Sequence, residues 1–253
     1  MLGSKNAIIK ANKKNYLTND LLPVDPRSGT NFLRAQFGFQ FQMPPVFKLS
    51  IFIERYLNDE RQNRNMRKSE LVYLIMAEGL AESQLEASKK LGISISTVNH
   101  ALGPLKRMGA VRTSRRGFEL LDKRKLLLFW ASTHELRVSY ATSVDSVAEA
   151  ERLVPQGVLP TSFAAFKRLY GNAPSDYSET YLYASERSLG ELKKRFPPSE
   201  RKPNFFVLQA PEQLFAFARK GCAPPSLVFV DLWNNKEWYA AEFAKALERE
   251  LLG

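Results

Sequence analysis

The sequence has 253 residues, of which 44% are hydrophobic and 25% are charged, and this composition excludes a disordered or fibrous chain. The formal net charge of +11 and the pI near 9.7 favour a polyanionic partner such as nucleic acid. We expect a cytoplasmic protein that does not enter a membrane, because the sequence has no signal-peptide core and no run of about eighteen apolar residues.

Residues 1–42 have the composition of a poorly ordered arm, because they are basic at first and then rich in turn-forming residues, with no sustained period. After this arm we predict a first domain over residues 43–136 and a second over residues 137–253. The segment PVFKLSIFIERYLNDE, residues 45–60, favours a short helix at the start of the first domain.

Two helices of the first domain are predicted from their caps. Ser69 favours a helix that stops near Gly79, with three residues facing a core: Leu71, Leu74 and Ile75. Ser83, followed three residues later by Glu86, forms a capping-box pattern that opens a second helix, and Gly92 ends that helix in a tight turn.

Ser94 caps a predicted third helix. Its apolar residues recur at the spacing of one buried stripe: Val98, Leu102, Leu105 and Met108. Proline inside a helix removes a hydrogen bond, so Gly103-Pro104 should kink or break this helix into residues 95–102 and 104–108.

The segment AVRTSRRGFELLD that follows Gly109 alternates around a Ser-Arg-Arg-Gly turn, which predicts two short strands paired as a hairpin. Three helices and a hairpin in this order predict a winged helix-turn-helix. Asp122 then caps a further helix, KRKLLLFWASTHEL, which we expect to connect the domains or to join a dimer interface.

Beyond Arg137 the composition alternates between helical and strand-like segments, which predicts a mixed α/β domain and places the whole chain in the α+β class. The predicted helices are VAEAERLV, SFAAFKRLYG, SERSLGELKKRF with Ser185 as cap, and a closing KEWYAAEFAKALEREL. The predicted strands are ETYLYA and NFFVLQA, whereas the apolar run SLVFVDLW fits a buried strand or a buried helix.

The predicted winged helix points to DNA because its third helix presents short polar side chains of the kind that bond base edges. Between Lys89 and Lys125 the chain has ten basic and two acidic residues, so this segment supplies a net +8. The residues expected to contact base edges or phosphates are Lys89, Lys90, Ser94, Ser96, Thr97, Asn99, His100, Lys106, Arg107, Arg112, Arg115 and Arg116.

The segments KKLGISISTVNHALGPLKRMGAV, RRGFELLDKRKLLLFWAS and PPSLVFVDLWNNKEWYAAEFAKALE together resemble archaeal transcriptional regulators of the AbiEi antitoxin type, over roughly residues 68–252. The resemblance implies an operator-binding winged helix and a C-terminal α/β domain that, in two-gene type IV systems, accompanies a nucleotidyltransferase-like toxin. It also implies that SLVFVDLW is helical. Ser88 departs from the usual alanine of the second helix.

No enzyme motif is found. A nucleotidyltransferase would need Asp-x-Asp, which is absent, and a PD-(D/E)xK nuclease would need an acid and a lysine on a strand, whereas Glu191 and Lys193 lie in a predicted helix. His134 and Cys222 lack an activating motif, and Asp231 needs a polar partner in its apolar surroundings. One cysteine and two histidines are too few for most zinc sites, so we expect no metal and no cofactor.

The sequence therefore predicts a transcriptional regulator that is not an enzyme and that binds a specific double-stranded DNA site as a homodimer. Three alternatives stay open: an antitoxin that neutralises a toxin protein, a nucleic-acid enzyme, and an architectural or replication protein that binds DNA without sequence preference. Aromatic residues of the second domain should fill its core, with an exposed subset left for a dimer or toxin interface: Phe205, Phe206, Phe229, Trp233, Trp238 and Tyr239.

Overall fold

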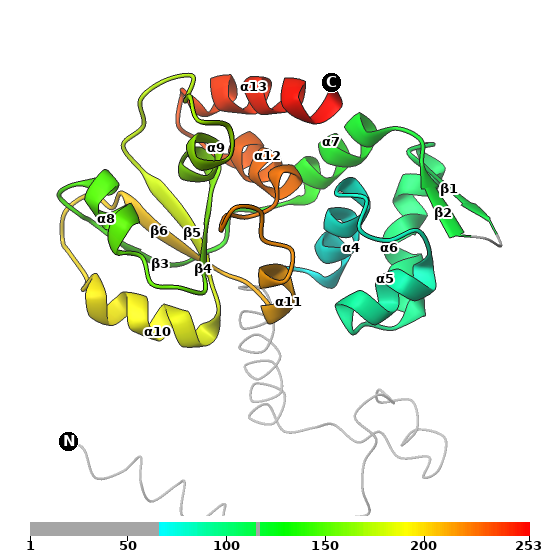
Figure 1. The fold of residues 1–253 in the computed structure, drawn as a ribbon, viewed down its shortest axis with the longest axis horizontal. Helices are drawn as coiled ribbons and strands as arrows, with labels where there is room; N and C mark the ends of the chain where they lie inside the picture. The colour runs from blue at the N-terminus through cyan, green and yellow to red at the C-terminus, as the bar shows by residue number, and fades with distance from the viewer. Residues whose placement is uncertain (1–65, 115–116) are drawn as a thin grey trace, which may run out of the picture. The chain divides into compact units, whose positions relative to one another are not determined.

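The computed structural model describes residues 66–114 and 117–253, which belong to one compact unit (Figure 1). Helices combine with a mixed β-sheet, so the predicted α+β class is confirmed. The predicted arm, the predicted helix at residues 45–60, and Arg115 and Arg116 lie outside the described residues. Within the described ranges, no helix has both the length and the apolar run needed to cross a bilayer.

The described chain begins with three helices, a hairpin and a fourth helix. They are α4 (Lys68–Ala77), α5 (Gln84–Leu91), α6 (Ile95–Arg107), β1 (Val111–Ser114), β2 (Gly117–Leu120) and α7 (Lys123–Thr133). Three predicted caps are confirmed, because the side chains of Ser83, Ser94 and Asp122 each accept the backbone N–H three residues on. The predicted hairpin is confirmed as an antiparallel pair.

Three local predictions for this part are wrong. Helix α4 begins at Lys68, before Ser69, because the Glu70 carboxylate accepts the Arg67 N–H at 2.7 Å and so provides the cap. Helix α6 continues through Pro104 to Arg107, so the predicted break is wrong, since proline leaves only one carbonyl without its donor and that carbonyl belongs to an exposed residue. Met108 is 38% exposed because it follows the last helical residue and leaves the buried stripe.

The rest of the chain alternates strands and helices. They are β3 (Val138–Thr142), α8 (Val147–Leu153), β4 (Val158–Thr161), α9 (Ser162–Tyr170), β5 (Thr180–Ala184), α10 (Glu186–Arg195), β6 (Phe205–Gln209), α11 (Glu212–Phe215), α12 (Pro225–Asn234) and α13 (Ala240–Leu252). Every helix and strand predicted here is confirmed, although α13 starts four residues later than predicted. The ambiguous SLVFVDLW segment is the helix α12, and β3, β4 and α11 were not predicted.

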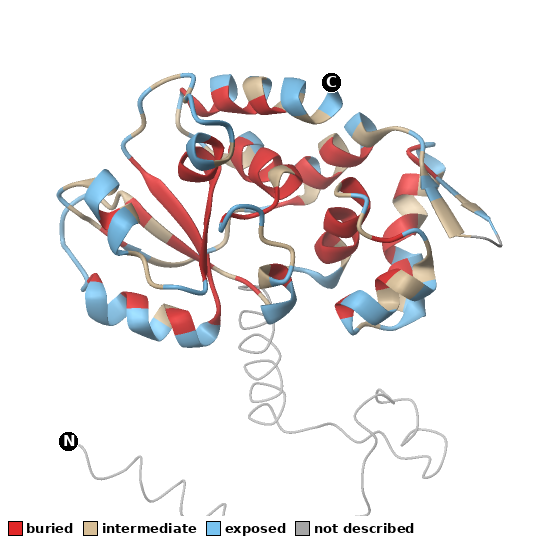
Figure 2. Ribbon diagram, in the orientation of Figure 1, coloured by how far each residue is buried: buried red, intermediate tan, exposed pale blue. Residues whose placement is uncertain are grey.

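The sheet has the order β3-β6-β5-β4, in which the central pair β5 and β6 is parallel and the two outer strands are antiparallel. Alternate residues of β4, β5 and β6 enter two different cores. Leu182 and Val207 pack in a small core with Leu192 of α10, whereas Tyr183 and Leu208 pack in the main core. Strands β4 and β5 are buried along their whole length, as Figure 2 shows.

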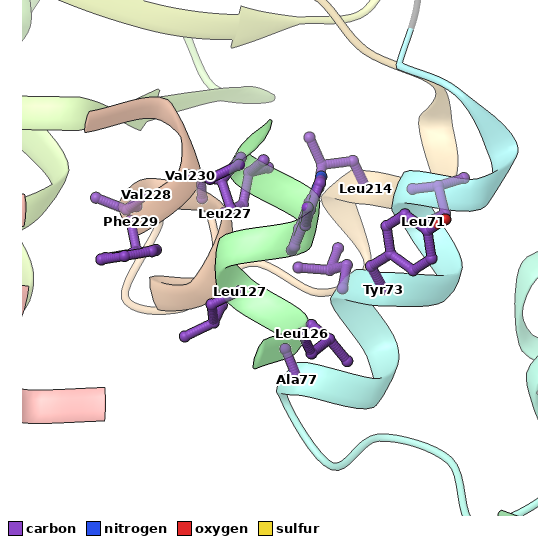
Figure 3. Close-up of a cluster of buried hydrophobic side chains, with 14 of the residues drawn as sticks. Leu71, Tyr73, Ala77, Leu126, Leu127, Leu214, Leu227, Val228, Phe229 and Val230 are labelled. Carbon is purple, nitrogen blue, oxygen red and sulfur yellow. The ribbon is translucent and has the colours of Figure 1, made fainter. Parts of the chain in front are cut away.

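The main core runs without interruption from the first three helices to the sheet. Figure 3 shows side chains of α4, α7 and α12 packed together, among them Leu71, Leu126 and Val228, with Leu214 of α11 beside them. Helix α12 is therefore a shared element, since it packs on α4 and α7 and also on α9, α13 and β4. The boundary predicted between residues 136 and 137 falls between α7 and β3, which this core spans.

Candidate nucleic-acid interface

The turn between α5 and α6 is held by side-chain hydrogen bonds. Gly92 ends α5 in the left-handed region, at φ 62°, where a side chain would be strained. The Ser88 hydroxyl donates to the Ile93 carbonyl at 2.6 Å, so the serine that departs from the resemblance fixes the turn. Ser94 then accepts the Thr97 N–H at 3.1 Å and sets the start of α6.

The inner face of α6 is apolar and packs on α4 and α5, through Val98, Ala101, Leu102 and Leu105. Its outer face is exposed and polar at Ser96, Asn99 and His100, while Thr97 is half-buried. The Ser94 cap accepts the N–H groups of Thr97 and Val98, so the N–H groups of Ile95 and Ser96 are the ones at this helix start that have no intrahelical acceptor. One helix therefore offers hydrogen-bonding side chains and a positive helix end on the same exposed surface.

The predicted basic residues differ in whether their side chains bond other groups of the protein. Lys106 donates to the Asn99 side-chain oxygen at 2.9 Å, so these two predicted site residues form one unit on the outer face of α6. Lys90 lies 2.8 Å from the Glu86 carboxylate and donates to the Leu80 carbonyl.

Lys89 and Arg107 are exposed at the ends of α5 and α6. Arg112 is exposed too, and it lies 3.6 Å from Glu119 across the hairpin. The structure thus places Lys89 and Lys90 on α5 and Arg112 on β1. The seven other described residues of the predicted site lie on α6 and its cap: Ser94, Ser96, Thr97, Asn99, His100, Lys106 and Arg107.

The hairpin is attached to the loop before α5 at a very close approach. The Phe118 N–H donates to the Glu82 carbonyl at 3.1 Å. A Cβ added at Gly117 would lie 2.1 Å from the same carbonyl oxygen, and Gly117 has φ 153°, so no other residue fits without displacement. This contact fixes the direction in which the hairpin extends relative to α5 and α6.

A buried polar cluster lies away from this surface and was not predicted as a cluster. His134, which ends α7, has one ring nitrogen 2.7 Å from Glu70 and the other 2.9 Å from Asp231. Asp231 also accepts hydrogen bonds from the hydroxyls of Tyr183, at 2.9 Å, and Thr161. Asp231 thus has the partners that its apolar surroundings require.

His134 carries a positive charge in this cluster. An ionised carboxylate only accepts hydrogen bonds, so His134 donates to both Glu70 and Asp231 when both of its ring nitrogens hold protons. Burial by itself would lower the pKa of His134, but its hydrogen bonds to Asp231 and Glu70 outweigh burial and raise the pKa to about 9. Burial raises the pKa of Glu70, yet the hydrogen bond and charge of His134 leave it below its ordinary value.

The cluster joins parts of the chain that are distant in sequence. Glu70 belongs to α4, His134 follows α7 and Asp231 belongs to α12. Two further bonds attach α12 to the same helices: the Ser226 N–H donates to the Glu78 carboxylate at 2.9 Å, and Asn234 donates to the Ala131 carbonyl at 2.9 Å. The role of this cluster is to hold α12 against α4 and α7.

The other residues considered for catalysis do not come together in one site of the described chain. Glu191 and Lys193 are exposed on α10, as predicted, and Asp176 lies in a loop. Cys222 is fully buried, and burial raises the pKa of its thiol, while both nitrogens of His134 are occupied by carboxylates. Within residues 66–114 and 117–253, no group of three or more Cys, His, Asp or Glu side chains could hold a metal ion.

Two surface features were missed or only partly anticipated. Ile95, the first residue of α6, is 47% exposed beside the polar residues, and an apolar side chain there suits a thymine methyl group. Of the six aromatic residues expected to fill the core, Phe205, Phe229 and Tyr239 are buried and Phe206 is half-buried, whereas Trp233 and Trp238 are exposed. The exposure of Ile95 could have been predicted from the sequence, because Ile95 directly follows the Ser94 cap.

Comparisons with protein families, with curated proteins and with solved structures find no match for this chain.

Proposed function

We propose that this protein is a sequence-specific double-stranded DNA-binding transcriptional regulator, and that residues 68–121 form a winged helix-turn-helix with α6 as recognition helix. The observation that carries the proposal is α6 itself, which buries one apolar stripe and exposes a polar stripe on the opposite side. A recognition helix needs this division, because it must hold a three-helix core and contact base edges at once.

In this proposal the residues of α6 have different tasks. Ser96, Asn99 and His100 contact base edges, and Asn99 is directed by its bond to Lys106. The exposed Lys89 and Arg107 neutralise phosphates, and Arg115 and Arg116 extend the same role to the hairpin turn. The proposal includes no catalytic activity.

The AbiEi-type resemblance is part of the proposal. The helical conformation of α12 supports it, because the resemblance implied a helix where residue propensities left a strand equally open. A toxin partner is a further hypothesis, which requires a surface of the protein that is free to bind the toxin.

The experiment selects duplexes from a random library with the full chain and measures affinity for the selected and a scrambled duplex at several salt concentrations. Ser96→Ala/Asn99→Ala/His100→Ala should reduce the preference for the selected duplex, since each lost base contact costs about 1–3 kcal/mol. Arg115→Ala/Arg116→Ala should weaken binding to both duplexes and reduce the salt slope by about 0.9 for each lost phosphate contact.

A matched control removes two exposed basic residues from α10, with Arg187→Ala/Lys194→Ala, and should leave affinity and salt slope unchanged. Equal binding of wild type to both duplexes would favour the architectural alternative. Absence of binding to any duplex would refute the proposal and leave the antitoxin hypothesis.

A further inference from the structure

An open hollow of about 350 Å³ lies between α12 and α13, on elements that contribute nothing to the candidate nucleic-acid interface. Its apolar lining comes from both helices, through Phe229 and Leu232 of α12 and Ala241 and Ala244 of α13. The two alanines are small, so the hollow is open where a larger residue would have filled it. Trp233 forms one side of it.

Two tryptophans are exposed on this part of the surface. Trp233 is 52% exposed and Trp238 is 79% exposed, whereas the third tryptophan of the chain, Trp130, is fully buried. Trp238 stands between α12 and α13 with its ring 5.4 Å from that of Tyr239. Exposed tryptophan beside an apolar hollow is typical of a protein interface, because tryptophan supplies much of the binding energy when it enters a pocket.

The edge of the hollow carries both signs of charge. Glu237 and Lys245 both line it, and neither takes part in an ion pair within the part of the chain that the structure describes. Glu248 is different, because it lies 2.6 Å from Arg124 of α7. One acid and one base on the same edge are therefore available to a partner.

We propose that this hollow, the exposed Trp233 at its side and Trp238 in the adjoining turn, together called the α12–α13 surface, pair with the same surface of a second copy of the chain. A two-fold interface is self-complementary, so each feature must find its counterpart within one patch. This patch has both a hollow and projecting aromatic rings, and both signs of charge. The choice of a second copy rests on the proposed function, in which two recognition helices read two half-sites.

The charges fix how the two copies meet. A two-fold axis that passes midway between Glu237 and Lys245 exchanges their positions, so Glu237 of each copy faces Lys245 of the other. The hollow lies around the same axis, where each copy presents Trp233 to the apolar lining of the other. The surface of α6 stays free, because no residue that lines the hollow belongs to α5, α6 or the hairpin.

The test measures the association of the full chain by sedimentation equilibrium without DNA. Wild type should form a dimer, and Trp233→Ala should raise the dissociation constant by about 30-fold or more, as expected for an aromatic side chain that lines the hollow. Leu153→Ala is the matched control, because Leu153 is an apolar residue of α8 with 57% exposure that lies outside the hollow. It should leave the dissociation constant unchanged.

Charge reversal gives a second test that does not depend on the tryptophans. Glu237→Lys and Lys245→Glu should each weaken the dimer, whereas the double variant should restore it, since each new charge again faces its opposite. A monomeric wild type, a dimer insensitive to Trp233→Ala, or a double variant weaker than both single variants would overturn the proposal. DNA binding is measured separately, so a monomer that still selects a duplex would leave the proposed function standing.

Discussion

Replacing His134 by glutamine should destabilise the protein and change how its stability depends on pH. The substitution removes the positive charge that lies between Glu70 and Asp231, whose side chains are 4% and 0% exposed. Removing one partner of a buried ion pair typically costs about 3–5 kcal/mol, because the remaining charge stays buried without compensation. We therefore expect the free energy of unfolding to fall by about this amount at pH 6.5.

The pH dependence gives the sharper result. The pKa of His134 is about 9 in the folded protein and 6.5 as its ordinary value, so between these limits only the folded chain holds the proton. Its contribution is complete below pH 6.5 and is lost as pH rises through about 9. In this window the free energy of unfolding of wild type should fall by about 1.4 kcal/mol per pH unit, or about 3 kcal/mol in all.

The assay is urea unfolding at half-unit steps from pH 6 to 9.5, followed by tryptophan fluorescence. His134→Gln should lack the fall that wild type shows, so the two stabilities should converge toward pH 9.5. The control is His100→Gln, which removes the only other histidine of the chain from an exposed position and should keep the wild-type slope. A flat wild-type profile, or an equal slope in His134→Gln, would refute a protonated His134.

Three further predictions concern Gly117, Ser83 and Cys222. Gly117→Ala should displace the hairpin from the Glu82 carbonyl and weaken DNA binding at least about tenfold, a loss of about 1.4 kcal/mol, whereas Gly190→Ala, with open space around it, should leave binding unchanged. Ser83→Ala should lower the free energy of unfolding by about 1 kcal/mol through loss of the α5 cap, and no change in urea unfolding would refute that role. The buried Cys222 thiol should react with a disulfide reagent far more slowly in the native than in the unfolded protein, and equal rates would contradict its burial.

The helix starts could be predicted because they depend on neighbours in sequence. Ser83, Ser94 and Asp122 each bond a backbone N–H three residues away, so a short pattern contains the whole interaction. The α4 start was misplaced because its cap uses Glu70, a glutamate whose other oxygen binds a histidine 64 residues away. A local pattern does not contain that second contact.

The strands and the buried cluster show where sequence patterns are insufficient. Strand β4 is buried at every position and has only four residues, so it has no alternation by which to find it. Of the cluster, only the need of Asp231 for a partner was predictable, because Glu70 and His134 approach it through the packing of α12 on α4 and α7. The outer face of α6 was predictable for the opposite reason, since helical spacing alone decides which side of it is buried.

The shared core around α12 has a consequence for transplanting this DNA-binding unit. A chimera that carries residues 66–136 onto another protein would leave Leu126, Leu127 and Ala131 of α7 without the helix that covers them. Such a fragment would be expected to aggregate or to recruit a substitute helix. The smallest transferable unit must therefore include α12. This helix lies about a hundred residues downstream in the sequence, since His134 and Asp231 are 97 residues apart.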